Sequence, residues 1–380
     1  MNARKPQLRI PAVYMRGGTS KGVFFHARDL PADTGTRDAL LLRIVGSPDP
    51  YGRHTDGMGG ATSSTSKVVI IAPSRRPGCD VDYLFGAVEI GAPLIDWSGN
   101  CGNLSGAVGP FAVSEGLVVA QEGVTRVRIW QQSLGKRIDA FVPVRDGAVV
   151  EAGDFHEDGV PFPAAEVRLE FLDPGGDDEG ADDRPGSAAE GANDQPDRTD
   201  PGDARRTALL PTGAVKDTLQ VPGVGRIEAT LISAGNPAVF VRAEALRLTG
   251  REMPDEVNRD RALLNRREAI RAHAAVAMGL ARTPEEATAT RPATPRLSWV
   301  AKPAHYRSSS GAEVGAGDID ILARIMSMGR LHHAYTGTGS VALAVAAALP
   351  GTIPNEIART LPGVPTRIGH VSGTLAVGAE

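Results

Sequence analysis

Short apolar runs, each closed by Pro or Gly, mark the first part of the chain. The segments 68–71 and 81–85 are rich in β-branched or aromatic residues, and a Pro or Gly follows each within two positions. Both segments therefore predict strands. Segment 124–130 alternates, with Val124 and Arg126 on one face and residues 125, 127 and 129 on the other. This alternation predicts a further strand.

The second part of the chain combines strand and helix patterns. Residues 225–241 predict strands on either side of a Gly-Asn-Pro turn. Residues 258–280 have helical spacing and predict one helix, whose apolar side carries Leu263, Ile270, Ala274 and Met278. Residues 340–349 are small and apolar, and because none is charged we expect a buried helix there.

The two halves of the chain echo one another. Each reads as a strand, a Gly-containing turn, a second strand and then a Gly-rich loop that leads into an apolar helix. The loop 101–103 precedes the apolar stretch 104–113, and the loop 336–339 precedes the stretch 341–349. This pattern predicts a duplicated domain with a cleft between the copies, where two helix N-termini converge.

Composition and charge add a domain division. The chain has 380 residues, of which 41% are hydrophobic, enough for a sizeable core. Segment 173–206 holds 11 acidic residues and 4 Arg, a local charge of −7 that leaves +3 elsewhere. We predict domains at 1–172 and 207–380, separated by a disordered acidic insertion at 173–206. A remainder of +3 suits a small anionic substrate and is too weak an excess for nucleic acid.

Cysteine content and hydropathy bear on the compartment. Two cysteines, Cys79 and Cys101, make a disulfide framework improbable, so the reducing cytoplasm is expected. Residues 1–14 lack the apolar core of a signal peptide. The apolar stretch 341–349 is much shorter than the roughly 20 residues that a membrane span requires. We therefore expect no membrane association.

The sharpest local feature is the hexapeptide 98–103, Ser-Gly-Asn-Cys-Gly-Asn, which stands directly before an apolar helix. Glycines let the backbone approach a ligand closely, and free N–H groups at a helix start attract a carboxylate. We expect Cys101 to have a depressed pKa and a functional role, rather than only to pack. Cys79 lies in a turn beside Pro77 and Gly78 and has no such setting.

Three further features are candidates for chemistry. Lys67 opens the apolar strand at 68, where burial would make it a base, and a lysine that reaches back to water is an equally favoured alternative. Residues 16–22 lack the Gly and Ser/Thr that a phosphate loop places around its lysine. A carboxylate-binding turn and an ordinary hairpin turn stay equally favoured there. His332 and His333 are adjacent and should diverge rather than chelate one metal, with at least one on the surface and the other facing the cleft.

Six motifs together resemble the PrpF family of methylaconitate isomerases. They are MRGGTSKGVFF at 15–25, GSPDP at 46–50, DGMGG at 56–60, NCGN at 100–103, SMGRLHHA at 327–334 and GHVSG at 369–373. The likeness runs along essentially the whole chain outside the acidic insertion. That insertion is longer than we expect for the family, and the chain ends sooner after Gly373.

The resemblance implies a fold and an activity. The fold is diaminopimelate epimerase-like, with two similar α/β domains, each a mostly antiparallel sheet wrapped around a central helix. The activity is a cofactor-free, metal-free isomerisation of an unsaturated tricarboxylate in propionate breakdown through the methylcitrate route. The family's catalytic residues fall on Lys67 and Cys101. The expected substrate-binding residues are Arg16, Gly17, Gly18, Thr19, Ser20, Ser66, Asn100, Gly102, Asn103, Asn236, His333, Thr336, Gly337, His370 and Ser372.

The chemistry of such a pair agrees with this activity. A proton next to a double bond that is conjugated to a carboxylate can be removed if N–H donors and cations stabilise the dienolate. Lys67 and Cys101 can serve as base and acid in either assignment. A homodimer stays open, and a small tricarboxylate is the expected partner.

Three alternatives remain at this point. A 4-oxalomesaconate tautomerase or a methylitaconate isomerase differs mainly in substrate. A racemase of the same fold needs two opposed thiols, and this chain has Thr336 where the echo would put the second. A noncatalytic carboxylate-binding protein would need the Gly-rich loops but neither Lys67 nor Cys101.

Overall fold

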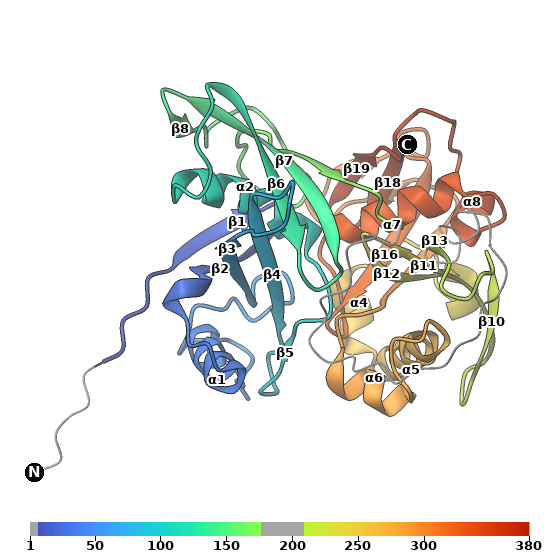
Figure 1. The fold of residues 1–380 in the computed structure, drawn as a ribbon. Coiled ribbons are helices and arrows are strands. Elements are labelled where there is room, and N and C mark those ends of the chain that lie inside the picture. Colours follow the sequence, from blue (N-terminus) through green and yellow to red (C-terminus); the bar gives the residue numbers. More distant parts are fainter. Residues whose placement is uncertain (1–6, 176–208, 380) are drawn as a thin grey trace, which may run out of the picture.

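Two large β-sheets, each packed around its own helix, make up the computed structural model, which describes residues 7–175 and 209–379 (Figure 1). The strands of the first sheet lie between residues 13 and 171, and those of the second between 217 and 377. The predicted acidic insertion lies outside the described residues, apart from 173–175. The domain boundaries at 172 and 207 stay a prediction.

The first half contains the nine-stranded sheet and two α-helices. Its strands are β1 (Val13–Gly17), β2 (Ser20–His26), β3 (Lys67–Pro73), β4 (Val81–Val88), β5 (Ile95–Asp96), β6 (Gly123–Gln131), β7 (Lys136–Arg145), β8 (Ala148–Val149) and β9 (Arg168–Phe171). Its helices are α1 (Thr34–Val45) and α2 (Gly102–Ser114), with a 3₁₀ turn at Ala27–Asp29.

The second half contains the eight-stranded sheet and most of the helices. Its strands are β10 (Asp217–Val221), β11 (Gly225–Ala234), β12 (Asn236–Arg242), β13 (Arg296–Ala301), β16 (Ile321–Ser327), β17 (Arg330–Leu331), β18 (Thr366–His370) and β19 (Gly373–Val377), with β14 (Tyr306–Arg307) and β15 (Glu313–Val314) as a separate pair. Its helices are α4 (Pro254–Arg259), α5 (Arg261–Ala277), α6 (Pro284–Thr290), α7 (Gly337–Ala348) and α8 (Ile353–Ile357), with a 3₁₀ turn at Ala243–Leu246.

Strand pairing shows that the two halves repeat one topology. In the first sheet the pairs β1–β2, β3–β4 and β6–β7 are antiparallel, whereas β2–β3 and β4–β6 are parallel. In the second sheet β11–β12, β13–β16 and β18–β19 are antiparallel, whereas β12–β13 and β16–β18 are parallel. The same alternation in the same order confirms the duplicated α/β unit, with a mostly antiparallel sheet in each copy.

The central helix occupies the same place in each unit. Helix α2 follows β4 and β5 and packs against β1, β2, β6 and β7, while α7 follows β16 and β17 and packs against β11, β12, β18 and β19. Neither helix contains a charged residue, and most of their side chains are buried. This confirms the apolar helices expected at 104–113 and 340–349. The sheets curl around them because an uncharged helix must be covered on all sides.

The predicted strands are confirmed, and the helix expected within 258–280 is confirmed as α5, although it starts at Arg261 rather than at 258. The chain forms α4 and α5 with a break at Asp260, whose backbone is extended. The Asp260 carboxylate accepts a hydrogen bond from the backbone N–H of Leu263 at 2.9 Å and caps α5. Asp is a favoured N-cap residue because its oxygen satisfies an otherwise free N–H group.

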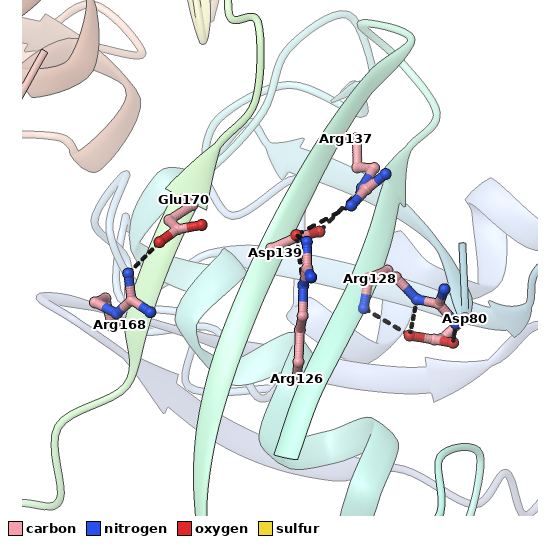
Figure 2. A network of polar contacts seen from close by, with 7 residues as sticks. All are labelled: Asp80, Arg126, Arg128, Arg137, Asp139, Arg168 and Glu170. Atoms are coloured by element: carbon pink, nitrogen blue, oxygen red, sulfur yellow. Dashed lines mark hydrogen bonds and ion pairs between the residues drawn. The ribbon is translucent and has the colours of Figure 1, made fainter. Parts of the chain in front are cut away.

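A cluster of ion pairs lies on the face of the first sheet that points away from α2 (Figure 2). Asp139 is fully buried and accepts hydrogen bonds from Arg126 and Arg137, whereas its neighbours Ile138 and Ala140 face the core around α2. Burial opposes ionisation of Asp139, but the two guanidinium groups hold its pKa below the usual value. These charges stabilise the outside of the sheet and take no part in the site described below.

Candidate active site

Cys101 stands at the start of the buried helix α2. It is the N-cap residue, and its Sγ accepts the backbone N–H of Leu104 at 3.5 Å. Its carbonyl oxygen accepts the hydroxyl of Ser105 at 3.0 Å, which fixes the turn from behind. The side chain is 4% exposed. The sulfur is therefore held at the positive end of a helix, which favours the thiolate.

Lys67 lies directly against this sulfur. It is the first residue of β3 and is 4% exposed, so the alternative in which it reaches back to water is wrong. Its Nζ lies 3.0 Å from Cys101 Sγ and 2.9 Å from Ser20 Oγ. The ammonium also lies 5.6 Å from the centre of the Phe85 ring. The amine and the thiol thus form one hydrogen-bonded, water-poor pair.

The electrostatics of the pair follow from burial and from this contact. Burial opposes ionisation of the Cys101 thiol, but Lys67 and the Leu104 N–H act against burial and leave the pKa of Cys101 below its ordinary value. The expected depressed pKa is thereby confirmed in direction. Burial lowers the pKa of Lys67, and the neighbouring sulfur partly offsets this shift. Both groups are therefore poised to exchange a proton nearer to neutral pH than free side chains would.

The N-termini of α2 and α7 meet beside the pair. A Cβ on Gly102 would lie 2.4 Å from the backbone nitrogen of Thr338, and a Cβ on Gly337 would lie 2.8 Å from the carbonyl carbon of Gly102. Only glycine fits at these two positions. Asn103 joins the helices, because its Oδ1 accepts the N–H of Gly337 at 2.8 Å while its Nδ2 donates to Thr19 Oγ1 at 2.6 Å.

The histidine pair lies inside the molecule rather than on its surface. His332 is 2% exposed and His333 is half-buried, so the expectation that at least one is a surface residue is wrong. Their rings stack at 4.8 Å, and the backbone N–H of Ala334 donates to His332 Nδ1 at 3.1 Å. His333 Nδ1 lies 3.3 Å from Ser64 Oγ, across the boundary between the halves. Burial, reinforced by the Lys67 charge, lowers the pKa of both rings.

The other residues expected in the site fall into two groups. The first group lies at the junction of the helices. Gly17 and Gly18 pack on Asn103, Thr19 accepts a hydrogen bond from Asn103, and Ser20 accepts one from Lys67. Asn100 donates its N–H to Asn236 Oδ1 at 3.3 Å, and Thr336 caps α7. The second group forms its hydrogen bonds away from that junction. Arg16 is exposed and donates to the carbonyl oxygen of Gly18, and the Ser66 hydroxyl is hydrogen-bonded to the His54 ring. Ser372 donates its hydroxyl to the carbonyl oxygen of His333, and its N–H donates to the His370 ring. Residues 16–22 form a hairpin whose strands pair from Gly17 and Ser20 outwards.

Sequence reasoning missed two polar residues near the pair. Arg296 is 4% exposed, and its charge acts on both Cys101 and Lys67. Thr338 is fully buried, and its hydroxyl has no hydrogen-bond partner within the described residues. For Arg296 a signal was present, since a lone cation at the start of an apolar strand had singled out Lys67. For Thr338, within an apolar helix, no comparable signal exists.

Among the residues that the structure describes, no group of three or more His, Cys, Asp or Glu side chains is arranged to hold a metal ion. Within the same residues, no helix is long and apolar enough to cross a membrane.

Comparison with known proteins agrees with this geometry. The 2-methyl-aconitate isomerase of Shewanella oneidensis is 51% identical, an alignment that covers 99% of this chain and 90% of that protein. A crystal structure of methylitaconate-delta-isomerase matches with a TM-score of 0.71 at 40% identity and covers 97% of this chain and 88% of that one. A crystal structure titled probable proline racemase, from Agrobacterium radiobacter K84, matches with a TM-score of 0.50 at 15% identity and covers 96% of this chain and 83% of that one, which shows a shared fold alone.

The match to a family is equally broad. Residues 7–182 and 182–380 match the family described as PrpF protein, so that both halves of the chain are covered. The motifs around Lys67 and Cys101 lie within the first of these segments. The chain belongs to the PrpF family.

Proposed function

We propose that this protein is an isomerase that moves a proton and a carbon–carbon double bond within an unsaturated tricarboxylate, with 2-methylaconitate as the substrate. One observation carries the proposal: Lys67 Nζ lies 3.0 Å from Cys101 Sγ, in a buried position beside two helix N-termini. A relative that is 51% identical is named 2-methyl-aconitate isomerase, which supports the choice of substrate.

The proposed reaction has three proton transfers that balance. The Cys101 thiolate removes a proton from the carbon next to the double bond, which gives a thiol and a dienolate. The Lys67 ammonium then returns a proton to the far carbon of the allylic unit and becomes a neutral amine. Finally the thiol passes its proton to the amine across the 3.0 Å contact, which restores the starting pair. Positioned acid–base groups of this kind contribute about 10²- to 10⁴-fold in rate.

The dienolate needs stabilisation where its charge develops. The first N–H groups of a helix have no partner within the helix, and the dipole favours negative charge there. Here two such termini meet, so that the positive ends of both helix dipoles lie at one small region. Asn236 adds a buried amide whose Nδ2 has no partner in the described part of the chain. Preorganised donors in a site without water are the largest single contribution in many enzymes.

A substrate panel tests the proposal. Purified protein is mixed separately with 2-methylaconitate, 3-methylitaconate and 4-oxalomesaconate, and the proton NMR spectra are followed with time. We expect conversion of 2-methylaconitate at the highest kcat/KM. Unchanged spectra for all three acids would refute the isomerase, and faster conversion of another acid would move the assignment to that substrate.

Two other function classes are less well supported. A racemase that uses opposed thiols would need a second cysteine at the start of α7, where Thr336 is the N-cap residue. A noncatalytic carboxylate-binding protein would not need a buried amine against a thiol, and such an unneeded pair would reduce stability. Racemisation of a proline enantiomer would support the racemase, and binding of 2-methylaconitate with an unchanged NMR spectrum would support the noncatalytic binding protein.

The wider setting of the enzyme is predicted from the sequence alone. Its place in propionate breakdown through the methylcitrate route, its cytoplasmic location and its independence of cofactors stay predictions. The roles of the substrate-binding residues predicted from sequence are proposals of the same kind.

A further inference from the structure

Arg296 occupies in the second half the position that Lys67 occupies in the first. Strands β11 and β12 correspond to β1 and β2, so β13 is the counterpart of β3. Arg296 is the first residue of β13, and Lys67 is the first residue of β3. Arg296 pairs with Ala238, the third residue of β12. Lys67 precedes the Val23–Val68 pair by one position and so lies opposite Gly22, the third residue of β2. The repeat therefore brings two buried cations to equivalent places.

Among the buried arginines of the described residues, which also include Arg267, Arg271 and Arg324, Arg296 makes the fewest hydrogen bonds. Its Nη1 donates to the hydroxyl of Ser327 at 3.1 Å, and its Nε is buried without a partner within the described residues. No ion pair to it is present in that part of the chain. By contrast, Arg271 pairs with Glu268 and reaches three carbonyl oxygens, and Arg324 reaches three carbonyl oxygens. Around Asp139, too, each arginine has a carboxylate (Figure 2).

A buried charge with one neutral partner is expensive to maintain. Removing a guanidinium from water without a carboxylate opposes folding, so that such groups are normally paired. The Cys101 thiolate and the Asp96 carboxylate act on Arg296 electrostatically, but within the described residues neither forms an ion pair with it, so the guanidinium can still accept an anion. The surroundings fit a carboxylate, because unpartnered Asn236 Nδ2 and Thr338 Oγ1 come from β12 and α7 of the same half, and His332 Nε2 is also unpartnered. The charge of Arg296 acts on His332 as well as on the Lys67–Cys101 pair.

We propose that Arg296 is a substrate-binding residue that holds one carboxylate of the tricarboxylate, opposite the Lys67–Cys101 pair. The proposal rests on the proposed function for the identity of the acid, but its geometry requires only a carboxylate ligand. The guanidinium presents donors in a planar fork that matches a carboxylate, which a lysine cannot do. The first half thus supplies a cation that can give up its proton, and the second half supplies one that keeps its charge.

Binding of acids that cannot isomerise tests the proposal. Isothermal calorimetry measures the Kd of wild type, Arg296→Gln and Arg296→Lys for tricarballylate (propane-1,2,3-tricarboxylate), for glutarate, which lacks its central carboxylate, and for methylsuccinate, which lacks a terminal one. We expect Arg296→Gln to weaken tricarballylate binding by about 10- to 100-fold, the loss of a charge-assisted hydrogen bond. The dicarboxylate that lacks the carboxylate held by Arg296 should bind wild type and variant equally. Arg296→Lys should fall between them.

Arg267→Gln is the matched control. Arg267 is also buried and also has an unpartnered nitrogen, but its guanidinium lies over Trp299, on the opposite face of β13 from Arg296. The Arg267→Gln variant should bind all three acids as wild type does. Circular dichroism is used to check that each variant is folded. Unchanged tricarballylate binding in Arg296→Gln, an equal loss for all three acids, or an equal loss in Arg267→Gln would overturn the proposal. If wild type binds tricarballylate but isomerises nothing, the proposed function fails and the role of Arg296 stands.

Discussion

The two halves of the molecule place different chemistry at equivalent points of one scaffold. At the start of the central helix the first half has Cys101 and the second has Thr336, and each side chain caps its helix. At the start of the third strand the first half has Lys67 and the second has Arg296. The pKa values of this thiol and this amine are both lowered, whereas a hydroxyl and a guanidinium ionise only at much higher pH. In the proposed function, the first half therefore moves protons and the second half binds the substrate.

This division also separates the protein from a racemase of similar fold. Inversion of one carbon by two thiols calls for matching groups on opposite sides of the substrate. A shift of a double bond instead requires one acid–base pair and a fixed counter-charge for the dienolate. In the second repeat these two positions hold Thr336 and Arg296, which do not exchange protons as a thiol and an amine do. This asymmetry fits an isomerase better than a racemase.

Removal of either member of the pair should have the largest effect. Cys101→Ser keeps a capping oxygen and Lys67→Met keeps the length of the side chain, yet each should lower kcat for 2-methylaconitate by about 10²- to 10⁴-fold. Steady-state kinetics measure this loss. Cys79→Ser is the matched control and should turn over normally, because Cys79 lies outside the site and burial raises its pKa. Near-wild-type rates in both pair variants would contradict the division between the halves.

The coupling between the two groups should appear in a thiol titration. In a Cys79→Ser background, ultraviolet thiolate absorbance reports Cys101 alone. The pKa of Cys101 lies below its ordinary value, despite burial, because Lys67 lies beside it. Lys67→Met should therefore move the titration to higher pH.

The same shift affects stability, and its sign can be worked out. A thiol whose folded pKa is depressed stabilises the fold above its unfolded pKa, and this contribution is lost as the pH falls through the folded pKa. With the Cys79→Ser, Lys67→Met protein, urea unfolding at several pH values should show that contribution reduced or reversed. An unchanged pH profile would mean that the amine does not ionise the thiol.

The bridge between the halves should matter less than the pair. Asn103→Ala removes the hydrogen bonds to Gly337 and Thr19 that hold the two helix starts together. We expect a loss of stability of about 1–3 kcal/mol, because the Gly337 N–H and the Thr19 hydroxyl lose their partner. Urea unfolding measures it, and kcat should fall through misplacement of the α7 donors. A variant of wild-type stability would show that the glycine contacts alone align the helices.

The second helix cap should give the smallest effect. Thr336→Val removes the oxygen that accepts the N–H of Gly339 at 3.2 Å and should cost about 1 kcal/mol of unfolding free energy. Thr336→Ser keeps this oxygen and is the control. Turnover should change far less than in Cys101→Ser, although both residues cap a central helix. Equal losses of turnover would remove the distinction between the two helix starts.

The functional setting of Cys101 and the duplicated topology were predictable from the sequence. Glycines around Cys101 and an uncharged helix after it are local signals, and the echo of strand, turn and Gly-rich loop in each half reflects the repeat. The role of Lys67 was undecided, since a lysine before an apolar strand is compatible with either burial or exposure until its partner is known. Cys101 is 34 residues away along the chain and reaches Lys67 only through the fold.

The errors have the same physical origin. The helical spacing over 258–280 continues past Asp260, so only the capping contact of its carboxylate with Leu263 reveals the break. His332 looks polar in sequence but is 2% exposed, and its neighbour His333 lies 3.3 Å from Ser64 of the other half. Arg296, like Lys67, is a cation at the start of a strand, and this local pattern does not distinguish a buried side chain from an exposed one. Burial of polar groups is decided by tertiary packing, which local patterns do not record.

Deuterium content of the product tests the central claim most directly. Wild-type protein converts 2-methylaconitate in D₂O, and proton NMR and mass spectrometry count the deuterium at the carbon that receives the proton. Proton transfer through Cys101 and Lys67, both of which exchange with solvent, predicts about one deuterium per product molecule. A product without deuterium would show that the double bond is rearranged without proton removal, for example through addition and loss of the Cys101 sulfur, and would contradict the account.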